Sequence, residues 1–370
     1  MDGDVLSSID QRIIDGQVNV ATDADGPTRS MSVTLYDPDH RLRLDSDAPT
    51  AGSLFADRML RAWYGVKVPG VGWVDAPVFT GPIMGVSRDD TTLNVECQGK
   101  DALALQPVWR TYTVEKGATK VDAIRRILRE RAGETDFDLP DLAVKLGSAA
   151  TLTPQPPEKR AQFNADTPWG LSRKIARSMS RHLFYDGHGR CRLRQIPGEP
   201  VFTFDESLIQ TAPQIKFDMT EMRNAVKVTG KTLHEGKEKK GTTQVPTHVV
   251  RGEAIAPANH PLSPERLGRK LEDGTLIGRV IPEYVTNDAV RSDREATRLA
   301  HQILADRLSQ QVDISFDALP VPHLEELDMI RVAYEDLNVH MRLERFSIPL
   351  THAGVMSVGD VKRVTKPRRR

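Results

Sequence analysis

Three side chains that could bind a metal lie close together in the sequence: His182, His188 and Cys191. They flank residues 186–189, Asp-Gly-His-Gly, a composition typical of a tight turn between two strands. A hairpin there would bring two of the three side chains together, as a zinc site requires. A fourth ligand is missing from this neighbourhood. We therefore interpret the segment as a solvated turn and expect neither a metal nor a cofactor.

Acidic residues suggest two further kinds of chemistry. Residues 23–26, Asp-Ala-Asp-Gly, resemble the beginning of a calcium-binding loop, but no glutamate stands where the loop would close, so a simple turn is the better interpretation. Glu325, Glu326 and Asp328 could supply the two carboxylates that a glycosidase uses. Nothing in the sequence marks one of them as an acid with a raised pKa.

The sequence patterns of common enzymes are absent. The chain has no glycine-rich phosphate loop, no Gly-x-Ser-x-Gly and no His-Glu-x-x-His. We therefore expect no catalytic residues and no enzymatic activity. Two other classes of function stay open as alternatives: a cell-wall hydrolase that cleaves glycan or peptide, and a module that binds glycans on a host surface.

Length and composition indicate a neutral chain of several domains. With 370 residues it is too long for one compact core. Basic and acidic residues number 51 each, which argues against a strongly basic nucleic-acid-binding protein. Two cysteines exclude a disulfide framework. No secretory signal is visible, and no run approaches the ~18 apolar residues of a membrane span, so we expect synthesis in a cytosol and no stable membrane insertion.

A six-residue phrase occurs twice and organises the predicted fold. Residues 59–64, Met-Leu-Arg-Ala-Trp-Tyr, return conservatively altered as residues 329–334, Met-Ile-Arg-Val-Ala-Tyr. Each copy alternates as a β-strand does, and each is followed by a second apolar run, at 78–86 and at 341–350. The repeat predicts two similar β-modules. The first occupies residues 1–110, and residues 311–365 complete the second.

Helices are predicted between the two β-modules. Residues 111–200 are interpreted as an α/β domain. Its expected elements are helices near 121–132 and 168–179, with Thr119 and Thr167 as N-caps, and a hairpin at 182–194.

Residues 201–310 are expected to hold a strand, a mobile polar insertion and the longest helix. The strand covers 226–230, and the insertion is rich in lysine, glutamate and glycine. The helix, near 293–308, begins with a capping box formed by Ser292 and Glu295. Residues 366–370 form a basic tail.

Four short motifs carry a resemblance to a known family. The first is a helix that begins at Thr167-Pro168-Trp169 and is followed by the hairpin sequence Leu-Phe-Tyr-Asp at 183–186. The second is the strand Asn-Ala-Val-Lys-Val-Thr-Gly at 224–230, and the third is the helix from Asp293 followed by a strand at 312–316. The fourth is the segment from Leu319-Pro320 to Val332. In order and spacing they resemble the phage tail hub, or minor tail protein, family. That family includes baseplate hub proteins and the N-terminal domains of contractile-injection spike proteins. Here Glu326-Leu327 replaces the Pro-Gly that is common in the last motif.

The resemblance implies a mostly β fold with α+β inserts, in which two similar β-barrel modules are combined with α/β domains. It implies a homotrimer at the tip of a phage tail, where six barrels form a ring between a sixfold tail and a threefold tip. The implied partners are the distal tail protein or tail tube ring, the tape measure protein, and spike or fibre components. DNA would pass only transiently through the central channel, without sequence-specific binding.

Exposed residues of the repeated phrase are candidates for subunit contacts. Neighbours on an alternating strand face opposite ways, so Trp63 or Tyr64 must point outward. Aromatic residues and arginine are enriched at protein interfaces. We therefore predict interface roles for Arg61, Trp63 and Tyr64 in the first copy, and for Arg331 and Tyr334 in the second.

Overall fold

The computed structural model describes residues 9, 12–22, 28–42, 44, 54, 58–154, 167–217, 222–234, 247–309 and 312–363. Three expected features lie outside these residues: the turn at 23–26, most of the polar insertion, and the basic tail at 366–370.

The largest element is a sheet of 12 strands. Its main path runs in the order β11-β19-β20-β22-β21-β1-β2-β5-β4-β3, and β18 pairs with both β22 and β12. The pairing of β11 with β19 is parallel, whereas the others in this sheet are antiparallel. The strands are β1 (Ile13–Ala21), β2 (Arg29–Tyr36), β3 (Met59–Val68), β4 (Gly72–Asp89), β5 (Thr92–Gln98), β11 (Phe202–Phe204), β12 (Gln214–Phe217), β18 (Val312–Ala318), β19 (Met329–Tyr334), β20 (Leu337–Arg342), β21 (Arg345–Pro349) and β22 (Met356–Arg363).

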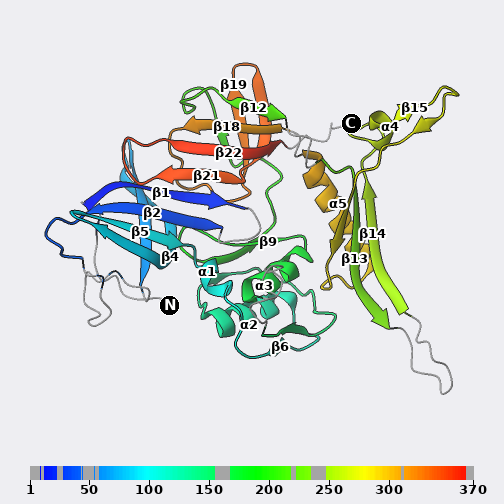
Figure 1. Cartoon of the computed structure of the whole chain (residues 1–370), viewed down its shortest axis with the longest axis horizontal. Helices are drawn as coiled ribbons and strands as arrows, with labels where there is room; N and C mark the ends of the chain where they lie inside the picture. Colours follow the sequence, from blue (N-terminus) through cyan, green and yellow to red (C-terminus); the bar gives the residue numbers. More distant parts are fainter. Residues whose placement is uncertain are drawn as a thin grey trace.

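Strand β1 joins the first and last parts of the chain (Figure 1). One edge of β1 pairs with β2, where Val18 lies opposite Met31, and the other pairs with β21, where Val18 lies opposite Ile348. The expectation of a mostly β protein is confirmed. Two separate closed barrels are not found among the described strands. Instead β1 pairs on both of its edges and joins the two modules in one open path from β11 to β3.

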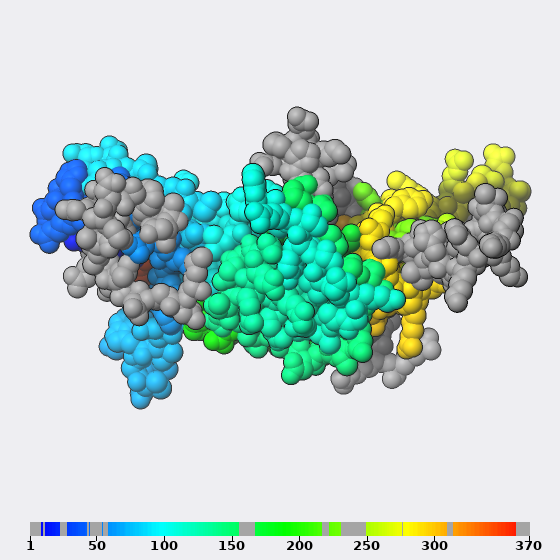
Figure 2. Space-filling view, turned by 90° about the horizontal axis from the view of Figure 1, so that it is seen from below, coloured from blue at the N-terminus to red at the C-terminus, as the bar shows by residue number. Residues whose placement is uncertain are grey.

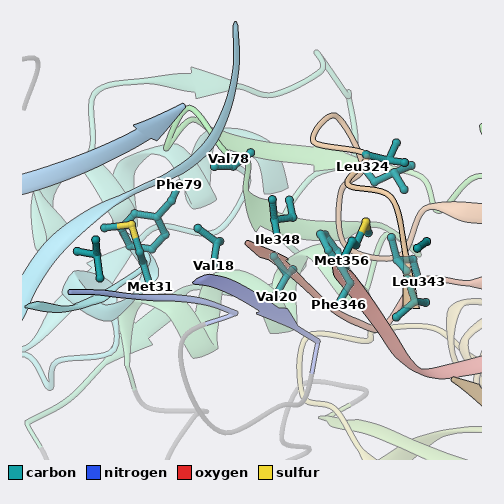
Figure 3. Packing of buried hydrophobic residues seen from close by; sticks show 14 of the residues in the cluster. Val18, Val20, Met31, Val78, Phe79, Leu324, Leu343, Phe346, Ile348 and Met356 are labelled. Carbon is teal, nitrogen blue, oxygen red and sulfur yellow. The ribbon is translucent and has the colours of Figure 1, made fainter. Parts of the chain in front are cut away.

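One hydrophobic core serves both halves of this sheet. Val18, Met31 and Phe79 from the N-terminal half belong to the same buried cluster as Ile348 and Met356 from the C-terminal half (Figure 3). The inward residues of β2 alternate with more exposed ones, as expected for a strand with one face on a core. Burial of apolar area is the main driving force for folding, so the two halves stabilise each other.

The two copies of the repeated phrase lie in hairpins near opposite ends of the sheet. The first copy is the beginning of β3, which pairs with β4, and the second is the whole of β19, which pairs with β20. Tyr64 and Tyr334, the last residues of the two copies, both pack partly buried against the shared core. The repeated phrase therefore lies in the first strand of each of two corresponding hairpins.

A smaller α/β unit has a core of its own. Thr119 caps the helix α2 by accepting a hydrogen bond from the backbone N–H of Asp122, and Gly133 ends it in the left-handed conformation. Thr167 caps the helix α3 in the same way. The elements are α1 (Asp101–Ala104), β6 (Tyr112–Val114), α2 (Lys120–Ala132), β7 (Phe137–Asp138), β8 (Ala150–Leu152), α3 (Pro168–Arg177), β9 (His182–Tyr185) and β10 (Cys191–Arg194).

A third unit consists of a three-stranded sheet covered by a long helix. The helix α5 (Asp293–Ser309) packs on β13 (Ala225–His234) and β14 (Thr247–Ile255), and β17 (Pro282–Thr286) pairs with β13. Gly252 permits this packing, since a Cβ there would lie 2.2 Å from the backbone of Ala296. Three short elements extend this unit: α4 (Pro264–Leu267), β15 (Arg269–Lys270) and β16 (Leu276–Ile277).

The molecule is elongated and has one projecting ribbon. In Figure 1 the α/β unit lies below the large sheet, and the third unit follows at the right end of the long axis. The β3–β4 hairpin stands out from the body, as the sky-blue projection in Figure 2 shows. Among the described residues, no helix is both long and apolar enough to cross a membrane.

Candidate functional site

The three potential metal ligands of the sequence go to different places in the structure. Cys191 is fully buried in the core of the α/β unit, and burial raises the pKa of its thiol well above the ordinary value. The His182 ring lies 2.6 Å from a carboxylate oxygen of Glu326, and the His188 ring meets Trp63 edge to face. Among the described residues, no group of three or more metal-binding side chains converges.

A buried arginine connects the large sheet to the α/β unit. Arg29, at the start of β2, is only 3% exposed. Its guanidinium donates to the backbone oxygen of Val78 at 2.8 Å and to that of Tyr185 at 3.2 Å, and it also pairs with the carboxylate of Glu325. The other oxygen of Glu325 accepts from the backbone N–H of Gly187 at 3.1 Å. The Arg29–Glu325 ion pair and its hydrogen bonds therefore connect four segments: β2, β4, the β9–β10 turn and the segment before β19.

The neighbouring acidic residues make a second connection of this kind. Arg194, on β10, donates to Asp328 at 2.8 Å and to the backbone oxygen of Glu326, and its guanidinium lies 4.7 Å from the ring centroid of Phe184. Asp328 also accepts from the backbone N–H of Glu325 at 2.8 Å. The carboxylates considered for a glycosidase pair thus bind groups of the α/β unit, and we assign them a structural role.

The turn between these carboxylates explains the departure from Pro-Gly. Leu327 has a φ of 59°, the left-handed region that favours glycine. Its backbone N–H donates to the oxygen of Leu343 at 2.8 Å. Glu326, in the place of the proline, has a fully buried side chain that reaches His182. Leu327 therefore takes a backbone conformation that favours glycine, and the side chain of Glu326 binds the neighbouring unit.

Further buried charges lie where the sheet meets the helices. Lys100 pairs with Glu134 at 2.8 Å, and both side chains are buried. Asp101 accepts two hydrogen bonds from Thr28, from the backbone N–H at 2.7 Å and from the hydroxyl at 3.1 Å. The junction is therefore polar, and its backbones pack closely: a Cβ on Gly187 would lie 2.1 Å from the backbone oxygen of Pro77.

Two acids of the junction have raised pKa values. Burial raises the pKa of Glu325 to about 7, although Arg29 and the N–H of Gly187 oppose the change. Burial likewise raises the pKa of Asp101 to about 6, with a contribution from the nearby carboxylate of Glu326. One oxygen each of Asp101 and Glu326 is buried without a hydrogen-bond partner among the described residues. Protonation of a carboxyl in this junction therefore relieves an unfavourable burial of charge.

The first copy of the repeated phrase presents its outward residues on the projecting ribbon. Arg61 is exposed and Trp63 is 52% exposed, while Tyr64 is half-buried against the core. The outward member of the Trp63–Tyr64 pair is thus the tryptophan. Its contact with His188 fixes the base of the ribbon and leaves about half of the indole open.

The second copy is more enclosed. The guanidinium of Arg331 donates to the side-chain oxygen of Asn338 across the β19–β20 hairpin at 2.9 Å. Tyr334 is half-buried against the core, as Tyr64 is. The five interface candidates therefore lie in corresponding hairpins, but they do not form one patch within a chain.

Sequence reasoning missed Arg29 and the roles of its partners. Arg29 precedes an alternating strand and resembles any exposed residue at a strand end. The sequence presents Glu325 and Glu326 as possible catalytic carboxylates, and Glu326-Leu327 as a departure from Pro-Gly. The departure from Pro-Gly is the signal for a structural role, because a charged side chain buried at such a turn needs a partner.

Comparison with solved structures identifies the class of fold. The tail protein from Neisseria meningitidis MC58 superposes with a TM-score of 0.59 at 13% identity, over 95% of this chain and 92% of that one. The 43 kDa tail protein of prophage MuSo2 from Shewanella oneidensis gives a TM-score of 0.56 at 12% identity, over 94% of both chains. No protein-family model and no curated protein matches the sequence. The chain therefore has the fold of phage tail proteins, as the motifs predicted.

Removal of the Arg29 guanidinium should destabilise the whole junction. We expect Arg29→Met to lower the free energy of unfolding by about 3 kcal/mol, because it leaves two backbone oxygens and Glu325 without their donor. Urea unfolding followed by circular dichroism measures the change. The matched control is Arg41→Met, since Arg41 and Asp39 form an exposed ion pair, and it should cost less than about 1 kcal/mol. Equal losses in the two variants would contradict the assigned role of Arg29.

The raised pKa of Glu325 makes stability fall as pH rises. Between its ordinary pKa of 4.5 and its folded pKa of about 7, the folded chain binds more protons than the unfolded chain, so the free energy of unfolding decreases with pH. Asp101 acts in the same direction at lower pH. We expect Glu325→Gln to flatten the slope above pH 5 in urea titrations, whereas Asp39→Asn should keep it. A slope unchanged by Glu325→Gln would refute this source of the pH dependence.

Proposed function

We propose that the chain is a structural virion protein: a trimeric tail hub at the distal end of a phage tail. The observation that carries the proposal is the pair of corresponding hairpins, β3–β4 and β19–β20, near opposite ends of one continuous sheet. Three such chains would present six similar hairpins around a ring. A ring of that kind suits a position where a sixfold tail meets a threefold tip.

The likeness to solved tail proteins supports the proposal over almost the whole chain. The sheet fused by β1 would form the ring that contacts the distal tail protein or the tail tube ring. The α/β unit and the third unit would contact the tape measure protein and the spike or fibre components.

The proposed mechanism is geometric and involves no catalysis. The candidate acids of the sequence are used to join the units, through the contacts of Glu325, Glu326 and Asp328. With 51 basic and 51 acidic residues, the chain carries no net charge that would hold a polyanion, so DNA would pass the channel only transiently.

Mass in solution and in particles tests this function. We expect the purified chain to have three times its 41.2 kDa mass by light scattering, and the chain to be recovered with isolated tails. Disruption of its gene should give particles without completed tails, restored by the wild-type gene. A monomer that degrades purified cell-wall polymer would contradict the hub and support a hydrolase.

A further inference from the structure

The β3–β4 ribbon leaves large apolar side chains open to solvent. From Gly65 to Asp75 each residue is exposed except Val68, which is half-buried. Trp73 and Val71 are 71% and 73% exposed. The ribbon contributes nothing to the core at its tip, and it projects from the body of the molecule (Figure 2). A hairpin of two strands is only marginally stable on its own in water. Contact with a partner would therefore stabilise the exposed tip.

Both faces of the ribbon are apolar. The register places Lys67 opposite Trp73 and Trp63 opposite Pro77, so the two tryptophans share one face. Val66 and Val74 pair on the other face. Exposed apolar patches of this kind mark sites of protein contact. Apolar side chains on both faces mean that either face can contact a partner.

The end of the sheet opposite the ribbon, at the β19–β20 hairpin, carries exposed acidic residues. The β19–β20 turn, which corresponds to the tip of the ribbon, consists of Glu335 and Asp336, and both are exposed. A hydrogen bond of 3.0 Å from the backbone N–H of Glu335 to Glu206 brings the loop after β11 beside this turn. Asp205 and Glu206 of that loop are also exposed, which makes four carboxylates at this end. We call it the acidic end.

An apolar side chain accompanies the carboxylates at the acidic end. Leu319, after β18, is 44% exposed, and its backbone N–H donates to the oxygen of Leu208 in the loop after β11. Between residues 61 and 77 the ribbon offers the opposite charge through Arg61 and Lys67, which are exposed, against one acid, Asp75. The two ends of one sheet are thus complementary in charge, and both offer apolar surface.

We propose that the β3–β4 ribbon of one copy docks against the acidic end of the next copy. This proposal rests on the trimeric hub proposed above and assigns the surface that closes its ring. Contact between opposite ends is heterologous, and repetition of such a contact closes a ring when the rotation per copy allows it. Trp73 and its apolar neighbours supply affinity, while Arg61 and Lys67 select the acidic end and set the register.

Charge reversal with rescue tests the docking. Arg61→Glu with Lys67→Glu, and separately Glu335→Lys with Asp336→Lys, should each raise the trimer dissociation constant roughly tenfold or more, because like charges then meet. All four changes in one chain restore opposite charges and should return the constant to within about threefold of wild type. Arg269→Glu with Lys270→Glu, on the exposed β15 strand, is the matched control and should leave the constant unchanged.

A second pair of variants tests the apolar contact. Val71→Ser with Trp73→Ser should raise the dissociation constant by about 100-fold, whereas Trp109→Ser, at a tryptophan 90% exposed in the α/β unit, should not change it. Circular dichroism and urea unfolding check that each variant is folded, which is expected because the changed side chains lie outside the core.

The outcomes separate the two proposals. A trimeric wild type whose ribbon and acidic-end variants also remain trimeric overturns the docking and leaves the hub intact. Loss of the trimer in the ribbon variants without rescue by the fourfold variant also overturns the docking, because the ribbon then binds another surface or another protein. A wild type that stays monomeric, in solution and in isolated tails, overturns the trimeric hub itself.

Discussion

The pairing of β1 with both β2 and β21 is the constraint on which the rest of the structure depends. Side chains alternate along a strand, so a slip of one residue would turn Val18 and Val20 out of the shared core. The same register places Arg29 opposite Val20, at the end of β2 nearest the α/β unit. Strand pairing near the N-terminus thus fixes where the buried guanidinium meets Glu325, which lies just before β19 at the other end of the sequence.

A junction held by several buried charges is consistent with the structural role proposed for the chain. The charges at the junction are costly to bury, and replacement by apolar residues is often as stabilising as an ion pair. Their value here is positional: Arg29 and Arg194 each bind a defined atom across the boundary between the large sheet and the α/β unit, and Lys100 binds Glu134 where the chain passes from one to the other. The hairpins that carry the repeated phrase are then held at fixed positions on one sheet.

Local features were predictable from the sequence, and long-range ones were not. Thr119, Thr167 and Ser292 predicted the starts of three helices, because capping depends on residues only a few positions apart. The short strand β11 was missed, since its partner β19 lies more than a hundred residues away and the pairing is parallel. The fusion by β1 was missed for the same reason: periodicity shows that a strand has a buried face, but it does not show which strands flank it. At the site, the repeated phrase located the ribbon, whereas the partners of Glu325 required the fold.

The proposed hub requires three copies of this chain in a ring at the tip of a phage tail. Electron cryomicroscopy of the assembled particle tests it most directly, because it gives copy number, position and symmetry together. We expect density for three chains between the sixfold end of the tail and the tip, with six similar hairpins around the channel. Density for this fold in another copy number, or away from the tail tip, would contradict it.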